Sequence, residues 1–406
     1  MIIWEVFKMA FGALRTNKLR SFLTLLGVII GVSSVITIIS ALEGMSQSIQ
    51  AELEQLGPST FIVTRFGIIT SHDDFMDALK RKPLRPEYAT AIEEGCEECE
   101  KIAIFADTYN EVKYRNRKLR FVRIEGGTSN IIDIIDAKLD QGRFHSAEED
   151  KTRSRVAFIG ATIKEELFPD VDPIGKSLKI GNIRYTIIGT AEKRGSSLNE
   201  DADKVVRIPF SAFIKDFAVR RHEISFFVKA KSVEKLDLAM DQTRVILRAH
   251  RHVPYNKDDD FGMVTADAVM AIVKDTTKFI RFGLVAISSI ALVVGGIIIM
   301  NIMMISVTER TREIGIRKSI GARQRDILLQ FLYEALILSL GGGIIGIAIG
   351  VALGDFLVGL LNMNIISSTF AITVGLVISM GTGLFFGIYP ALKASRLQPV
   401  KALSYE

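Results

Sequence analysis

The sequence has few of the side chains from which metal, redox and hydrolytic sites are usually built. Its 406 residues include two cysteines, Cys96 and Cys99, and five histidines. A structural zinc site needs about four ligands, and this Cys-x2-Cys pair has no second pair, so the alternatives are a local disulfide or two free thiols. The chain has no His-Glu-x2-His and no Gly-x-Ser-x-Gly sequence. These absences argue against a zinc protease and a serine hydrolase.

A complete nucleotide-binding loop is also missing. Gly175-Lys176-Ser177 matches the end of a Walker A loop, which needs a first glycine five residues before Gly175. That position is Asp170. We therefore expect a turn between strands here. The chain is not expected to be an ATPase, and no cofactor or metal site is predicted in it.

Charge is nearly absent from four long stretches, which is the most informative absence of all. A membrane-spanning helix needs about 20 apolar residues. Only one charged residue, Glu334, lies in the predicted spans. These spans are Phe22–Leu42, Phe282–Thr308, Ile327–Leu353 and a fourth placed near Phe370–Pro390. We predict an α-helical membrane protein with four transmembrane helices and a large extracytoplasmic α+β domain between helices 1 and 2.

The distribution of basic residues orients this topology. The segment 1–21 carries four basic residues, and the 309–326 loop carries six basic against three acidic residues. Residues 43–281 carry 38 basic and 39 acidic residues. The positive-inside rule therefore places both termini and the 309–326 loop in the cytoplasm and residues 43–281 outside the cell membrane. The net charge of +5 reflects this asymmetry and does not indicate nucleic-acid binding.

Three parts of the chain follow from these signals. Residues 1–42 combine an amphipathic N-terminal helix, lying on lipid, with the first span. Residues 43–281 form the outer domain, and residues 282–406 hold the last three spans, the 309–326 loop and a tail. In the outer domain, β-branched and aromatic residues predict strands at 60–66, 118–125, 156–160, 185–190 and 224–230. Helices are predicted at 87–94, 162–168, 233–248 and 266–280, the last continuing into the second span, while the first span continues to Leu56.

Glycines recur at a spacing of four within the spans. Such faces let helix backbones approach closely, so the pattern predicts tight bundling or dimerisation. The residues are Gly27, Gly31, Gly342, Gly346, Gly350, Gly354, Gly383 and Gly387. Glu334 lies within the third span, where a lone carboxylate is costly. An ion pathway would need partner acids in the other spans, so a snorkelling or hydrogen-bonded structural role is favoured.

The 309–326 loop carries the strongest local signal. Glu313 and Arg317 form a favourable i,i+4 pair on a helix, and Ile316 and Ile320 share an adjacent face. A short charged helix with an apolar stripe is suited to insertion into a groove of a soluble partner. The alternative is a solvated basic loop that only satisfies membrane topology.

Several motifs in one order resemble a known family. The segment from Asn17 to Gly31 resembles the first span of MacB-type ABC transporter permeases, which are relatives of FtsX and of LolC and LolE. The segment 309–322 is similar to the coupling segment of that family. Further matches are Gln330–Gly343, Tyr389-Pro390-Ala391, residues 397–403, and, in the outer domain, Gly142-Arg143-Phe144, residues 148–150, Leu167-Phe168-Pro169 and residues 172–176.

The resemblance implies a permease that couples ATP hydrolysis by another subunit to movement of its outer domain, for export or extraction of a substrate. It implies a homodimer or a pair of paralogous permeases, and an outer lobe, roughly 106–209, inserted into a membrane-proximal lobe. ATP and magnesium would bind a cytoplasmic ABC ATPase, which is expected as a separate polypeptide because this sequence begins at the membrane region. A periplasmic or extracellular adaptor is a further expected partner. The coupling residues would be Arg310, Arg312, Glu313, Ile314, Gly315, Ile316, Arg317 and Lys318.

A second function stays open. FtsX-like proteins use the same coupling to regulate extracellular cell-wall hydrolases without exporting a substrate. A membrane-anchored enzyme is the third class, and the sequence has no catalytic motif to support it.

Overall fold

The computed structural model divides the chain into two compact units. The helical unit comprises Met1–Gln47 and Asp275–Glu406, and the sheet unit comprises Ser48–Lys274. The structure describes residues 18–54, 56–135, 138–193, 196–197, 200–217, 223–360 and 369–403. The predicted N-terminal amphipathic helix therefore falls almost entirely outside the described residues. The boundaries between the units lie slightly inside the predicted outer domain of residues 43–281.

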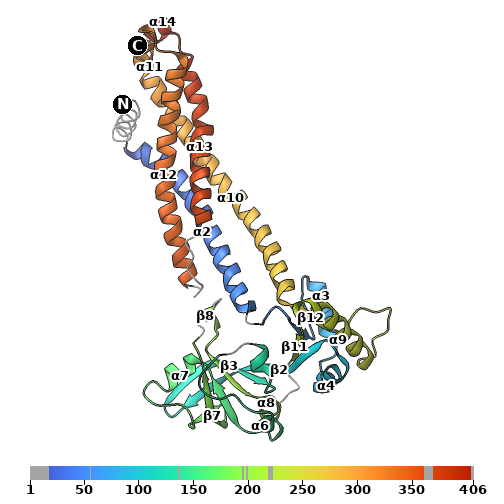
Figure 1. The fold of residues 1–406 in the computed structure, drawn as a ribbon. Helices are drawn as coiled ribbons and strands as arrows, with labels where there is room; N and C mark the ends of the chain where they lie inside the picture. The colour runs from blue at the N-terminus through green and yellow to red at the C-terminus, as the bar shows by residue number, and fades with distance from the viewer. Residues whose placement is uncertain are drawn as a thin grey trace. The chain divides into compact units, whose positions relative to one another are not determined.

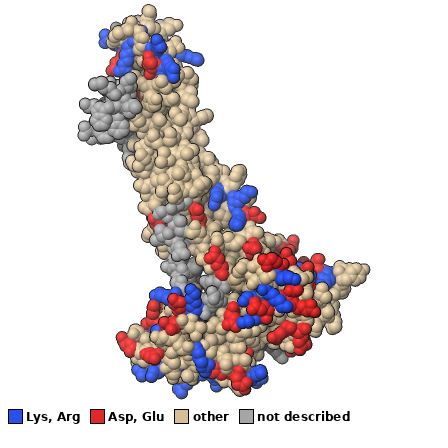
Figure 2. All heavy atoms as spheres, in the orientation of Figure 1, with Lys and Arg blue, Asp and Glu red and all other residues tan. Residues whose placement is uncertain are grey.

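Among the described residues, four helices are long and apolar enough to cross a membrane, and each contains one predicted span. They are α2 (Lys18–Glu54), α10 (Ala266–Glu309), α12 (Gln324–Leu360) and α13 (Thr369–Ser395). Two short helices, α11 (Thr311–Ser319) and α14 (Pro399–Leu403), complete the helical unit. Both lie at one end of the bundle (Figure 1), and charged side chains gather at that end, next to a long uncharged surface (Figure 2).

The helical bundle has its own apolar core. Val32 and Ile36 of α2 pack with Phe331 and Ala335 of α12, and Ala391 of α13 joins the same cluster. Pro390 is buried inside α13. The predicted extension of the first span is confirmed, because α2 ends at Glu54 and Gly57 follows with a positive φ of 72°.

The sheet unit is built on one ten-stranded mixed sheet. Its strand order is β12-β1-β11-β2-β3-β10-β5-β7-β4, and β6 pairs with both β2 and β7. The strands are β1 (Thr60–Thr64), β2 (Cys99–Tyr114), β3 (Arg117–Gly127), β4 (Leu139–Gly142), β5 (Val156–Ile159), β6 (Ser177–Ile180), β7 (Ile183–Ala191), β10 (Val205–Pro209), β11 (Ile224–Ala230) and β12 (Gly262–Thr265). A separate hairpin joins β8 (Ser196–Ser197) to β9 (Glu200–Asp201).

Short helices cover this sheet. They are α3 (His72–Lys80), α4 (Pro86–Gly95), α5 (Ile131–Ile134), α6 (Ala147–Lys151), α7 (Ala161–Leu167), α8 (Phe210–Asp216), η2 (Val233–Lys235) and α9 (Leu236–His250). Helices α4 and α9 pack on β2 and β1 at one end of the sheet, and α7 and α8 pack on β3 and β10 further along it. Alternate residues of β11 are buried, as expected when one strand face meets a core.

All five predicted strands and all four predicted helices of the outer domain are confirmed within a few residues. The prediction missed β2, the longest strand, because charged residues interrupt its apolar pattern. One face of β2 packs on the main core through Ala106 and Val112, and Ala103 on the other face packs on a smaller cluster with Ile131 and Ile134. This strand also runs through residue 106, where the outer lobe was expected to begin, and the division into two lobes stays a prediction.

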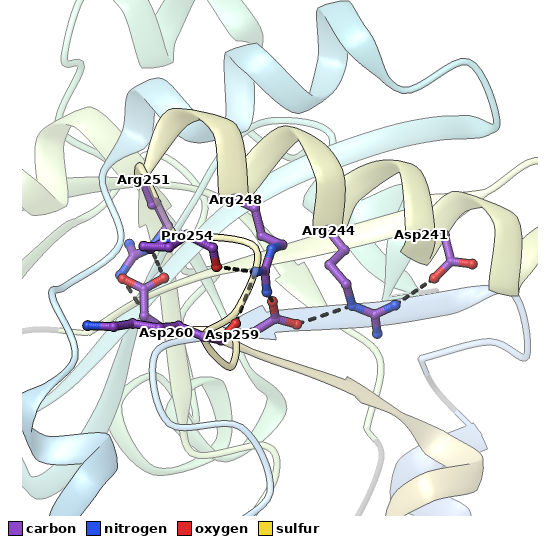
Figure 3. A network of polar contacts seen from close by, with 8 residues as sticks. Asp241, Arg244, Arg248, Arg251, Pro254, Asp259 and Asp260 are labelled. Carbon is purple, nitrogen blue, oxygen red and sulfur yellow. Dashed lines mark hydrogen bonds and ion pairs between the residues drawn. The ribbon is translucent and has the colours of Figure 1, made fainter.

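Arginines on α9 and directly after it fix the following loop (Figure 3). Arg244 and Arg248 both donate to the Asp259 carboxylate, at 3.1 and 2.6 Å. Arg251 is buried and forms two hydrogen bonds with the Asp260 carboxylate, at 2.6 and 2.7 Å. Charge-assisted pairs of this kind are stronger than neutral hydrogen bonds. They therefore hold the start of β12 against the end of α9.

Two sequence alternatives are settled by the sheet unit. Cys96 and Cys99 form a disulfide, so the free-thiol alternative is wrong. Gly175 lies in a turn with a positive φ of 77°, and β6 starts two residues later. The predicted turn is thus confirmed, although it connects helix α7 to β6 and does not lie between two strands as expected.

Candidate functional site

Helix α11 holds the predicted coupling residues. It starts directly after α10, where the Thr311 hydroxyl donates to the Val307 carbonyl, and ends at Ser319. The predicted Glu313–Arg317 pair is present at 3.9 Å between carboxylate and guanidinium. Glu313 lies in the first turn of α11, and Arg317 and Lys318 lie in its last turn. This placement of charges is favourable in the field of the helix dipole. The loop is therefore a defined helix and not an irregular connection.

One side of α11 faces the rest of the helical unit. Thr311, Ile314 and Gly315 are buried. A Cβ atom added at Gly315 would lie 2.7 Å from the Cβ of Ala402, so α14 packs directly on this glycine. A larger residue at position 315 would push α14 away from α11.

Three basic residues join α11 to the long helices. Lys318 donates to the carbonyls of Ser395 and Leu397 at 2.6 and 2.7 Å, which are at the C-terminal end of α13. A cation is favourable at this end of a helix because its carbonyl groups lack partners. Arg317 donates to the side chain of Gln330 on α12 at 3.0 Å. The third residue, Arg310, lies opposite Glu334.

Glu334 is paired and buried. Its side chain is 6% exposed, and both of its oxygens lie 3.4 Å from the Arg310 guanidinium. This arrangement agrees with the predicted hydrogen-bonded role, because an ion pair makes a buried carboxylate less costly than an isolated one. The pair ties the start of α11 to α12.

The other side of α11 is open to solvent. Arg312 and Glu313 are exposed, Ile316 is 45% exposed, and Ile320, just after the helix, is 82% exposed. The eight predicted coupling residues therefore divide into two groups. Ile314, Gly315, Arg310 and Lys318 anchor the helix, whereas Arg312, Glu313 and Ile316 present a mixed charged and apolar surface. Arg317 belongs to both groups, because it contacts Gln330 on α12 while its side chain is still 38% exposed.

The glycines of α12 line one helix contact. Gly342, Gly346, Gly350 and Gly354 all face α2, and a Cβ added at Gly346 would lie 3.0 Å from the Ile29 carbonyl oxygen. Thr37 of α2 also donates to the Gly350 carbonyl at 3.1 Å. The spacing of four therefore places a row of backbone against backbone along these two helices.

The remaining predicted glycines also lie at contacts inside the chain. A Cβ added at Gly27 would lie 2.7 Å from the Cα of Gly295 on α10, and one at Gly31 would meet Leu292 at 2.8 Å. Gly383 and Gly387 of α13 face Ser339 and Ala335 of α12. These glycines therefore pack the helices of one chain against each other.

Sequence reasoning missed several partners of these residues. Gly295, Gly296, Gly343 and Gly375 also lie at helix contacts, although no spacing of four marked them. Gln330 and Ala402 lie in motifs that resemble the family, but the sequence did not indicate that they contact Arg317 and Gly315. Among the described residues, no group of three or more His, Cys, Asp or Glu side chains is placed to hold a metal ion.

Two family profiles cover most of the chain. The profile described as MacB-like periplasmic core domain matches residues 21–246, and the profile described as FtsX-like permease C-terminal matches residues 285–399. The chain belongs to the MacB-like family of permeases. The resemblance found in the motifs is thereby confirmed, and with its four apolar helices the permease is a multi-pass membrane protein.

Curated relatives extend along the whole permease. It is 32% identical to the macrolide export ATP-binding/permease protein MacB of Bdellovibrio bacteriovorus, over 98% of the permease and 61% of that relative. It is 34% identical to MacB of Chlorobium luteolum, over 98% and 59% of the two chains. The pyoverdine export ATP-binding/permease protein PvdT of Pseudomonas aeruginosa is 33% identical, over 98% and 58%. The permease thus spans about three fifths of the length of these relatives.

Solved structures also resemble the sheet unit at low identity. The periplasmic region of MacB from Actinobacillus actinomycetemcomitans aligns with a TM-score of 0.46 and 15% identity, over 55% of the permease and 95% of that chain. The extracellular domain of the ABC-type transporter YknZ aligns with a TM-score of 0.41 and 14% identity, over 51% and 100%.

Proposed function

We propose that this chain is the permease part of an ABC transporter that exports or extracts a substrate with energy from ATP. In this proposal α11 contacts a cytoplasmic ABC ATPase, a separate polypeptide that binds ATP and magnesium. Movement of α11 is relayed through α12 and α13 and changes the shape of the extracytoplasmic sheet unit. Both termini are cytoplasmic, and two permease copies assemble. The relatives' names mention two different exported compounds, so we propose a class of activity and no particular compound.

The division of α11 into an anchored side and an open side carries this proposal. Lys318, Arg310 and Arg317 tie the helix to α13 and α12. A push on the open side is therefore transmitted to two long helices, because a helix with several fixed contacts moves as a rigid piece. Ile316 and Ile320 supply apolar area for a groove, and Arg312 and Glu313 supply charges that orient the partner.

The test separates docking from coupling. The permease is purified from its native host in mild detergent, and the ATPase that co-purifies is reconstituted with it in lipid. We expect Ile316→Asp or Arg312→Glu to weaken ATPase association about tenfold or more, because both residues lie on the open side. We expect Lys318→Met to keep association while lowering ATP turnover that depends on the permease, because it cuts α11 from α13.

A matched control is available on α10. Lys278 is exposed and lies far along the chain from α11, so Lys278→Glu should leave both association and turnover unchanged. Purification without any ATPase would contradict the proposal. Recovery of the ATPase together with a cell-wall hydrolase, and no exported substrate, would instead support regulation of an extracellular enzyme.

A further inference from the structure

Positive charge accumulates on one face of the sheet unit. Four neighbouring strands, in the order β3-β2-β6-β7, place a cation opposite a cation at each step. Lys118 is opposite Lys113, Lys113 is opposite Lys179, and Lys179 is opposite Arg184. Because neighbouring strands lie about 4.8 Å apart, these four side chains form one continuous row.

The row lies on the solvent side of the sheet. Successive side chains of a strand point to opposite faces. Val112, Ile180 and Tyr185, each next to a row member in sequence, are fully buried. Lys118, Lys179 and Arg184 are exposed, and the Lys113 side chain is 44% exposed. The cations are therefore free to meet a partner.

Charge at this end of the face is not balanced. Among the described residues, Glu111 is the only carboxylate that forms an ion pair with a member of the row, reaching Lys113 at 2.5 Å, and it lies 3.6 Å from Arg120. Further along the same two strands the arginines do have carboxylates, since Arg123 pairs with Asp107 at 3.2 Å. Like charges directly opposite one another destabilise a sheet, so this face retains a charge that does not serve its own folding.

A β-bulge adds an aromatic side chain beside the cations. Strand β3 has one extra residue here, so that Arg120 and Phe121 together face Glu111. The extra residue lets Leu119 and Val122 both face the core and turns Arg120 and Phe121 outward. Phe121 has a positive φ of 52° and is 80% exposed. A bulky residue rarely adopts this backbone conformation, and such strain often marks a functional position.

We propose that this surface, the cationic face, docks an acidic protein partner that has an apolar pocket for Phe121. The cationic face comprises Lys113, Lys118, Arg120, Lys179 and Arg184. An exposed aromatic ring next to arginine is typical of residues that dominate protein–protein binding, whereas a phosphate polymer would need only the charges. The proposal does not depend on the ATPase-coupling function, because every residue in it belongs to the sheet unit.

Two defined polymers test the proposal on the full chain in detergent micelles. Poly-L-glutamate probes charge alone, and a random copolymer of glutamate and tyrosine probes charge together with an aromatic group. We expect wild type to bind the copolymer more tightly than poly-L-glutamate. Replacing Lys113, Lys118, Lys179 and Arg184 with Glu should weaken binding of both by about tenfold or more, as should added salt. Phe121→Ala should weaken binding of the copolymer by about fivefold and leave binding of poly-L-glutamate unchanged.

The control set carries the same change in charge elsewhere on the sheet unit. Lys82, Lys151, Lys231 and Lys257 are exposed and lie outside the cationic face, so their replacement with Glu should weaken either probe much less. If the variant with four Glu substitutions in the cationic face fails to fold, a variant with Gln at the same four positions replaces it. Equal loss in both Glu sets would overturn the proposal. Tighter binding of polyphosphate than of the copolymer, unaffected by Phe121→Ala, would show a phosphate polymer as the ligand and would also overturn it.

Discussion

In the helical unit the long helices contact each other through glycines, whereas in the sheet unit large apolar side chains pack the sheet against its helices. Gly27 and Gly295 bring two backbones together, while Phe158, Phe213 and Phe226 fill the core of the sheet unit. The difference follows from the solvent. In water, burial of large apolar groups stabilises the fold, but in lipid it does not, and close van der Waals contact between backbones replaces it.

The two units also treat charge differently. Glu334 is the only charged residue within the predicted spans, and it is paired with Arg310. The sheet unit tolerates many exposed charges, and it also buries a pair, Arg207 with Glu125, at 2.7 Å. Variants that loosen one unit should therefore leave the other unchanged. Hydrogen–deuterium exchange on the full chain measures the two units separately, because it reports protection segment by segment.

The largest effect is expected for Arg207→Met. The change leaves the Glu125 carboxylate buried without its closest partner, which costs about 3–5 kcal/mol in known cases. We expect protection of β3 and β10 to fall by this amount and protection of α12 to remain. Arg184→Met is the matched control, since Arg184 is exposed on a strand and should change protection by less than about 0.5 kcal/mol. Equal effects of the two variants would contradict the prediction.

The second effect tests the glycine contacts. Gly295→Val should destabilise the helical unit by about 1–3 kcal/mol, because the new side chain would overlap the backbone of α2. Gly283 lies on the same helix with no neighbouring atom within 4 Å of an added Cβ. Gly283→Val should therefore be nearly neutral, and the sheet unit should be unaffected by either change. Loss of protection in β3 with Gly295→Val would show that the units are not independent.

A third prediction concerns pH and the start of α6. Glu149 accepts two hydrogen bonds from Arg143, both 2.7 Å, and one from the Ser146 backbone. These bonds, chiefly those from Arg143, lower the pKa of Glu149 to about 2 from its ordinary 4.5. Since the folded pKa is below the unfolded one, the stabilisation is present above about pH 4.5 and is lost as the pH falls towards 2.

Glu149→Gln should therefore cost about 1 kcal/mol of local stability at pH 7 and nothing near pH 2. Exchange protection around α6, measured across this range, gives the difference. Glu148→Gln is the neighbouring control, because the Glu148 side chain forms no ion pair among the described residues. A cost for Glu149→Gln that is the same at both pH values would rule out the carboxylate charge as its cause.

The smallest effect is expected at the bulge of β3. Phe121→Gly should raise local stability by about 0.5 kcal/mol, because glycine removes the strain of the positive φ but adds freedom to the unfolded chain. Phe121→Ala keeps the strain and should not stabilise. Protection of the β2 and β3 amides gives the comparison. Stabilisation by alanine equal to that by glycine would mean that the backbone here is not strained.

The sequence predicted well wherever the signal is local. Four spans followed from missing charge, and the α11 helix followed from the i,i+4 spacing of Glu313 and Arg317. The prediction was weaker for the glycines, because glycine pairs occur at helix contacts both within one chain and between two chains. The glycine repeats indicated bundling or dimerisation, and the partners of Gly342 and Gly350 on α2, some 300 positions earlier in the chain, favour bundling within one chain.

The sequence by itself determined the number of spans, the large sheet unit between the first two and the family, because hydropathy and motif order are properties of neighbouring residues. Only the tertiary structure decided which coupling residues anchor α11 and which remain open, because Lys318 finds its carbonyl partners 77 and 79 residues away. It alone also aligned Lys118, Lys113, Lys179 and Arg184 in one row. Strand register sets that alignment, and register depends on pairing between segments that are distant in the chain.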